Sequence, residues 1–315
     1  MKATTLEPTL FILRNSSGGI EALVATHVDD LLVAATAHGE AVVKSLSEVF
    51  VIKTWPEYTF RYCGREIVQD PKTFENTVSM QDYAAANEPC VISRERRSDP
   101  TSPLTPAELG SLRAINGALG WLTTQGRPDL AFLVSRCQGL VANAAVASWI
   151  EANRVVKQAK ARSSVLLRYK SFPLEGAGLA CVSDASFGNM PGGRSQSGSF
   201  ILLADRDLIQ GRVGRFSLLV WRSGRQKRAC RSTFGAETLA LSDTADRGDF
   251  VRGLLHEALV GGDPRVSEDA GLPLRWVVDA KDLYDTLTRA GSHSTTEHRL
   301  AMEIGILREL LQRHD

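Results

Sequence analysis

The sequence predicts an α+β fold in two parts, and three observations support this prediction. In the second half, short apolar runs typical of buried strands alternate with long helical patterns, as over residues 234–259. In the first half, strand-like runs around polar turns precede a series of helical patterns that begins near residue 112. Between the halves, residues 171–178 have the Pro- and Gly-containing composition of a linker. We therefore expect one unit over residues 1–170 and a second over residues 178–315.

Composition limits the class of protein. The 315 residues are 43% hydrophobic, which is enough for two domains that each have a core. The formal net charge is +1, so nucleic-acid binding would depend on local basic patches. The five cysteines form no Cys-x-x-Cys pair, and no histidine lies at zinc-ligand spacing, which argues against a disulfide framework or a structural zinc.

The same features predict a reducing, intracellular location, cytoplasmic or nuclear. The first residues lack the continuous apolar region of a signal peptide. No apolar run approaches the roughly 18–20 residues that a membrane span requires. We therefore expect no membrane association.

The first unit should begin with two strands around a turn, over residues 9–13 and from residue 21 onward. Asp29 and Asp30 then lie between two apolar runs, as at the tip of a hairpin. These acids fit either a solvated polar turn or a metal site for nucleotidyl transfer. The elements expected after them are an amphipathic helix over 38–50, a strand pair at 60–67, a hairpin turn at 70–72, a charged surface loop over 93–106, and core helices within 112–122, 126–135 and 149–162.

The second unit should form a sheet with helices. Its expected elements are strands at 179–184, 200–203, 216–221 and 274–279, a helix over 234–259, a short helix after residue 279 and a last helix over 297–312. Ser232 and Thr233 can cap the long helix, and the Gly-Gly-Asp-Pro run that begins at Gly261 should end it.

Three acids in this unit occupy matching places. Asp184 and Asp279 each end an apolar strand, and Glu237 lies near the start of the long helix. This layout can bring carboxylates together at one rim of a sheet. Asp184 alone fits a simple turn, but three acids together favour a site for paired divalent cations, which require oxygen ligands. One cation would activate a water, and the other would stabilise the leaving oxygen of a phosphodiester.

Four segments of the second unit carry a resemblance to a known family. They are Val-Ser-Asp-Ala-Ser around Asp184, Trp-Arg-Ser-Gly-Arg-Gln-Lys from Trp221, Gly-Ala-Glu-Thr-Leu-Ala around Glu237, and Val-Val-Asp-Ala around Asp279. Together they resemble the ribonuclease H domain of copia-type retrotransposon polyproteins. The resemblance implies that Asp184, Glu237 and Asp279 ligate Mg²⁺ or Mn²⁺. It also implies a fourth acid near the end of the chain, for which Glu303 is the nearest match and Glu309 the competing candidate.

The first unit resembles the reverse transcriptase of the same family. His-Val-Asp-Asp-Leu-Leu from His27 is similar to that family's Tyr-Val-Asp-Asp-Leu-Leu box, with histidine in place of tyrosine. Segments near residues 60–67, 78–83 and 112–122 resemble later parts of the palm and thumb in the same order. The implied fold is a partial reverse-transcriptase palm with a helical thumb or connection, followed by a ribonuclease H-like mixed sheet with helices. Asp29 and Asp30 would then be polymerase metal ligands, although the fingers and the first part of the palm are missing.

The resemblance implies an enzyme that hydrolyses RNA in RNA–DNA hybrids with Mg²⁺ or Mn²⁺. RNA-directed DNA polymerase activity is expected only in a full-length polyprotein that supplies the missing N-terminal segment. Basic residues before Glu237 form either a nucleic-acid-binding patch or a solvated loop; they are Arg222, Arg225, Lys227, Arg228 and Arg231. Two alternatives stay open: a catalytically inactive, nucleic-acid-binding transposon remnant, and a pseudogene product that does not fold alone because half a palm exposes sheet edges.

Overall fold

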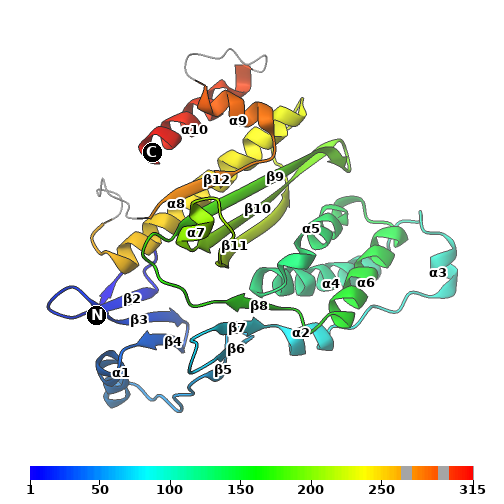
Figure 1. The fold of residues 1–315 in the computed structure, drawn as a ribbon. Coiled ribbons are helices and arrows are strands. Elements are labelled where there is room, and N and C mark those ends of the chain that lie inside the picture. The colour runs from blue at the N-terminus through cyan, green and yellow to red at the C-terminus, as the bar shows by residue number, and fades with distance from the viewer. Residues whose placement is uncertain (264–271, 290–297, 315) are drawn as a thin grey trace.

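The computed structural model describes residues 1–263, 272–289 and 298–314. The predicted α+β class is confirmed: the described strands form three four-stranded sheets, and helices lie between and around them (Figure 1). None of the helices in these ranges combines the length and apolarity that a membrane span requires.

The first sheet is antiparallel in the order β1-β2-β3-β4. Its strands are β1 (Lys2–Ala3), β2 (Leu10–Arg14), β3 (Ile20–His27) and β4 (Asp30–Ala35). Helix α1 (Ala37–Lys44) follows, and a 3₁₀ turn (Ser45–Glu48) completes the helical segment predicted over 38–50. The hairpin between β3 and β4 confirms the predicted turn at Asp29, because His27 pairs directly with Asp30.

The second sheet and a helical unit form the middle of the chain. The sheet contains β5 (Thr59–Tyr62), β6 (Arg65–Gln69), β7 (Asn76–Ser79) and β8 (Leu166–Tyr169). The helices between β7 and β8 are α2 (Gln81–Ala86), α3 (Arg94–Ser98), α4 (Pro106–Gln125), α5 (Ala131–Gly139) and α6 (Val146–Ala161). Helix α3 lies within the segment that the sequence predicts to be a loop. The prediction is wrong there because this charged segment has little apolar pattern, whereas the Ser93 side chain caps the helix by accepting a hydrogen bond from the Arg96 backbone N–H.

The third sheet is mixed, in the order β11-β10-β9-β12. Its strands are β9 (Gly178–Met190), β10 (Arg194–Ala204), β11 (Phe216–Arg225) and β12 (Leu274–Val277). Strands β9, β10 and β11 pair antiparallel, whereas β12 runs parallel to β9. The helices that follow or cover these strands are α7 (Arg206–Ile209), α8 (Thr233–Leu259), α9 (Lys281–Thr288) and α10 (Ala301–His314).

Helix α8 packs tightly on one face of this sheet. Apolar residues of β9, β10 and β12 form a buried cluster against Val251 and Leu255 of the helix. A Cβ atom at Gly248 would lie 2.4 Å from the Sγ atom of Cys181, so only glycine permits this close approach. The approach holds the middle of α8 beside β9.

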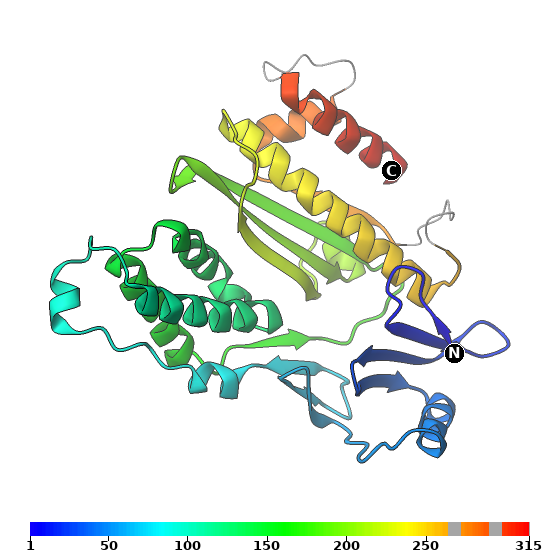
Figure 2. The ribbon, with the colours of Figure 1, turned by 180° about the vertical axis from the view of Figure 1, so that it is seen from behind.

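The other face of the third sheet turns toward the helical unit α4–α6 (Figures 1 and 2). The Trp221 side chain on β11 donates a hydrogen bond from Nε1 to the carbonyl oxygen of Thr123 on α4, at 2.8 Å. At the far end of α8, Arg14 of β2 donates from Nη2 to the carbonyl oxygens of Glu257 and Ala258. The first and second units therefore contact each other at both of these places, among others.

Residues 171–177 connect β8 to β9 and contain no helix or strand, as expected of a linker. Arg215 nevertheless holds this segment, because its Nη1 donates to the Ser171 carbonyl oxygen at 3.2 Å and its guanidinium lies over the Phe172 ring. The division into units at residues 170 and 178 stays a prediction.

Candidate metal site

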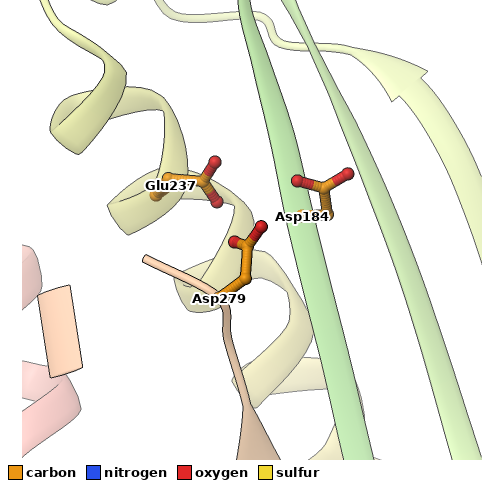
Figure 3. A group of neighbouring side chains, drawn as sticks. All are labelled: Asp184, Glu237 and Asp279. Atoms are coloured by element: carbon orange, nitrogen blue, oxygen red, sulfur yellow. The ribbon is translucent and has the colours of Figure 1, made fainter. Parts of the chain in front are cut away.

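Three acids meet beside the third sheet, where β12 ends next to the middle of β9 (Figure 3). The prediction that Asp184 ends its strand is wrong, because β9 continues to Met190. Asp184 lies on β9, Glu237 in the second turn of α8, and Asp279 just after β12. One carboxylate oxygen from each residue lies within 4.8 Å of the other two. We call these residues the acidic cluster. The arrangement can hold a metal ion.

The topology of the sheet explains why residues so far apart in sequence converge. Strand β12 runs parallel to β9, with Val277 opposite Val182, so Asp279 and Asp184, each two residues further along, lie side by side. The Ser232 side chain caps α8 by accepting a hydrogen bond from the Gly235 backbone N–H at 3.0 Å. This cap fixes where the helix begins and places Glu237 on the side that faces β9.

Glu237 is the buried member of the cluster. It is 5% exposed, and its Oε2 atom has no hydrogen-bond partner among the described residues. Burial, followed by repulsion from the Asp184 carboxylate, raises the pKa of Glu237 to about 7, although a hydrogen bond from the Ala185 backbone opposes this shift. Asp279 and Asp282 add further repulsion. Without a cation, the proton that Glu237 retains near neutral pH therefore reduces the repulsion between the carboxylates of the cluster.

The residues present fit a hard divalent cation. All three donors are carboxylates, and hard cations such as Mg²⁺ and Mn²⁺ prefer oxygen ligands. The unpaired Oε2 atom of Glu237 supplies a buried oxygen for which such a cation would be a partner. A bound cation would also replace the proton that Glu237 holds near neutral pH.

Glu303, the predicted fourth ligand, does not join this cluster. It lies in the first turn of α10, where its Oε2 accepts a hydrogen bond from the Ser242 hydroxyl at 2.7 Å and its Oε1 pairs with Arg228. These two partners hold the pKa of Glu303 below its ordinary value. The competing candidate, Glu309, is exposed further along the same helix.

Asp29 and Asp30 occupy an exposed hairpin tip. Val28 before them adopts a positive φ of 56° and is 93% exposed, so the tip points into solvent. Among the described residues, no third His, Cys, Asp or Glu converges on these two acids. The predicted hairpin is present, but the structure lends no support to a metal site at this tip.

A basic pocket lies between α8 and the neighbouring strands β10 and β11. It has a volume of about 340 Å³, and its cationic lining residues are Arg222, Arg225, Lys227, Arg228 and Arg247. Four of these belong to the basic run identified in the sequence. Arg247 was not identified, although its i,i+4 spacing from Asp243 on the long helix places both on one helical face. Asp243 and Glu303 also line the pocket and offset part of its charge.

No protein-family model matches the chain, and no curated protein matches it either. The resemblance to copia-type polyproteins therefore depends on the motifs in the sequence and stays an expectation.

Proposed function

We propose that the chain is a nuclease of the ribonuclease H type, which hydrolyses the RNA strand of RNA–DNA hybrids. The observation that carries this proposal is the convergence of the acidic cluster beside a mixed sheet, with one member buried and its Oε2 unpaired among the described residues. In this proposal, residues 178–315 form the ribonuclease H-like domain, and residues 1–170 form a partial reverse-transcriptase palm with its thumb or connection.

In this mechanism, Asp184, Glu237 and Asp279 would hold Mg²⁺ or Mn²⁺. When bound, such cations would polarise a water and would offset the charge that develops on the phosphodiester in an in-line displacement. Glu237 must release its proton before it can act as a ligand, and its pKa of about 7 allows this release near neutral pH. No side chain needs to form a covalent intermediate.

The basic pocket supports a nucleic acid as the substrate. Arginine and lysine side chains bind phosphates without regard to base sequence, and this contribution dominates the affinity of many nucleic-acid-binding proteins. The pocket shares α8 with the acidic cluster, because Ser242 and Arg247 on this helix line it. A duplex whose backbone enters the pocket would therefore contact the same helix that carries Glu237.

One observation favours the second candidate, an inactive nucleic-acid-binding remnant. The fourth carboxylate implied by the resemblance is engaged by Ser242 and Arg228 instead of by the acidic cluster. Polymerase activity is proposed only for a longer polyprotein. In such a polyprotein a further palm strand could pair with β4, which lies at the edge of its sheet among the described strands.

A cleavage assay with a labelled RNA–DNA hybrid tests the proposal. The 315-residue chain should cut the RNA strand in Mg²⁺ or Mn²⁺, and Asp184→Asn should lower the rate by roughly 100-fold or more, because it removes a charged ligand. Asp30→Asn is the matched control, since it makes the same change at the exposed hairpin tip and should cleave like the unchanged chain. Binding of the hybrid without cleavage by the unchanged chain would favour the inactive remnant. Equal cleavage by Asp184→Asn would refute the site.

A further inference from the structure

A cleft lies on the face of the third sheet opposite to α8. It has a volume of about 440 Å³ and separates β9–β11 from residues 128–132 at the start of α5. Asp184 lines this cleft and also belongs to the acidic cluster. A molecule bound in the cleft would therefore adjoin the proposed metal site.

The floor of the cleft is open because its central residue is a glycine. Gly198 on β10 pairs with Asp184 on one side and with Ser223 on the other. A Cβ atom at Gly198 would have no heavy atom of the described residues within 4 Å. Glycine within a strand weakens it, and it is often found where a ligand approaches the backbone closely.

Aromatic side chains form the walls. Phe200 and Trp221 are direct cross-strand partners, and the hydrogen bond from Trp221 to the Thr123 carbonyl oxygen holds its indole in place. Phe132 approaches from the helical side. Phe132 and Phe200 remain 41% and 43% exposed, so they present apolar surface that a flat ligand could cover.

Gln196 supplies an unpaired acceptor. Its side chain is 4% exposed and lines the cleft, and its Nε2 donates to the Ser135 hydroxyl at 3.1 Å and to the Ser223 hydroxyl at 2.8 Å. These two bonds fix the amide group between the helix and the sheet. Its Oε1 atom has no partner within the described parts of the chain. Buried acceptors are rarely left unpaired, so a donor on a ligand is the natural partner here.

We infer that the cleft binds one nucleoside of the nucleic-acid strand whose phosphate lies at the acidic cluster. A nucleobase has flat faces for stacking on aromatic side chains and N–H groups that can donate to the Gln196 Oε1. A base in the cleft has left the stack of its duplex, which costs least where the base is unpaired or mismatched. The chain should therefore prefer hybrids with an unpaired nucleotide beside the cleavage point. The position of the phosphate rests on the proposed function, whereas the base-binding cleft does not.

Fluorescence of 2-aminopurine tests this inference without cleavage. The full chain is titrated, in EDTA, into a hybrid that carries one 2-aminopurine in its RNA strand, either paired or opposite a gap. Stacking should quench the unpaired probe and make that hybrid bind roughly 10-fold more tightly than the paired one, as expected for one base–aromatic stack.

Gly198→Leu should abolish the quenching and the preference for the unpaired probe, because the new side chain fills the floor of the cleft. Gly110→Leu is the matched control, since Gly110 is exposed on α4, also has open space at its Cβ position and does not line the cleft. Phe200→Ala removes one wall without filling the floor, so it tests the cleft if Gly198→Leu fails to fold. Full quenching by a folded Gly198→Leu or by Phe200→Ala would overturn the inference. Because no cation is present, an inactive nuclease would still give the expected quenching.

Discussion

The hairpin tip and the acidic cluster begin from the same sequence signal, an acid at the end of an apolar strand, but they differ in their surroundings. At the tip, Asp29 and Asp30 are neighbours on one turn and lie in solvent. In the cluster, the acids come from two parallel strands and a helix, and Glu237 is buried between them. Adjacent acids in a turn share a location, whereas acids delivered by separate elements can surround a cation. The difference teaches that convergence depends on topology and not on spacing along the chain.

The largest expected effect is the absence of primer extension. The 315-residue chain should incorporate no nucleotides on a primed RNA template, because two exposed acids on one tip hold a pair of metal ions poorly. His27 also stands where the Tyr-Val-Asp-Asp-Leu-Leu box of the resembled reverse transcriptases has tyrosine. A gel assay with labelled primer in Mg²⁺ and in Mn²⁺ measures this directly. Template-directed extension would show that the tip holds metal without further ligands.

The pH dependence of stability separates the two acidic sites by their burial. Glu237 has a folded-state pKa of about 7, above its ordinary value of 4.5, so the folded protein retains a proton that the unfolded chain releases. The stability contributed by this proton is present below about pH 4.5 and is lost as the pH rises through 7. The free energy of unfolding of the metal-free chain should therefore fall across this window, by up to about 3 kcal/mol.

Urea unfolding at about pH 5 and about pH 8 measures this decrease in the free energy of unfolding. Glu237→Gln should remove the decrease, because the amide does not titrate, and it should also remove the stabilisation by Mg²⁺ at the higher pH. Asp30→Asn should leave both the decrease in stability with pH and the stabilisation by Mg²⁺ unchanged. An unchanged pH dependence in Glu237→Gln would show that other groups cause the decrease.

Glu303 provides a smaller test of how many acids the cluster needs. Glu303→Gln weakens the ion pair to Arg228, whose side chain is 66% exposed, and should cost about 1 kcal/mol of stability or less. Cleavage should stay within roughly 10-fold of the unchanged chain, because Glu303 does not converge with the three ligands. Loss of cleavage as complete as that caused by Asp184→Asn would mean that substrate or metal draws Glu303 into the cluster.

The linker gives the smallest expected effect. Limited proteolysis should first cut between Lys170 and Gly178, where the chain forms no helix or strand. Arg215 should slow this cut, so Arg215→Ala should increase its rate a few-fold, as measured by mass spectrometry of the fragments. A first cut within residues 179–203 would contradict the expected compact second unit.

The sequence predicts much of the acidic cluster because Asp184 and Asp279 each follow a clear apolar run and Glu237 lies near the start of a long helical pattern. It misses the extension of β9 to Met190, because Ser186, Gly188 and Asn189 interrupt the apolar pattern after Asp184. This extension is held by pairing with β10 across the Gly-rich turn. It also gives no signal for the contacts of Glu303 with Ser242 and Arg228. Leu300, just before α10, and Ile304 and Leu307 within α10 are buried, and their packing sets the rotation that turns Glu303 toward Ser242. The cleft has no local signal, because its walls come from α5 and from strands more than 60 residues later in the chain.

Anomalous scattering from Mn²⁺-soaked crystals of the full chain tests the central claim most directly. A strong anomalous peak should lie between the carboxylates of Asp184, Glu237 and Asp279 and should be lost in Glu237→Gln, and no peak should lie at Asp29 and Asp30. A peak at the hairpin tip and none at the acidic cluster would contradict the account.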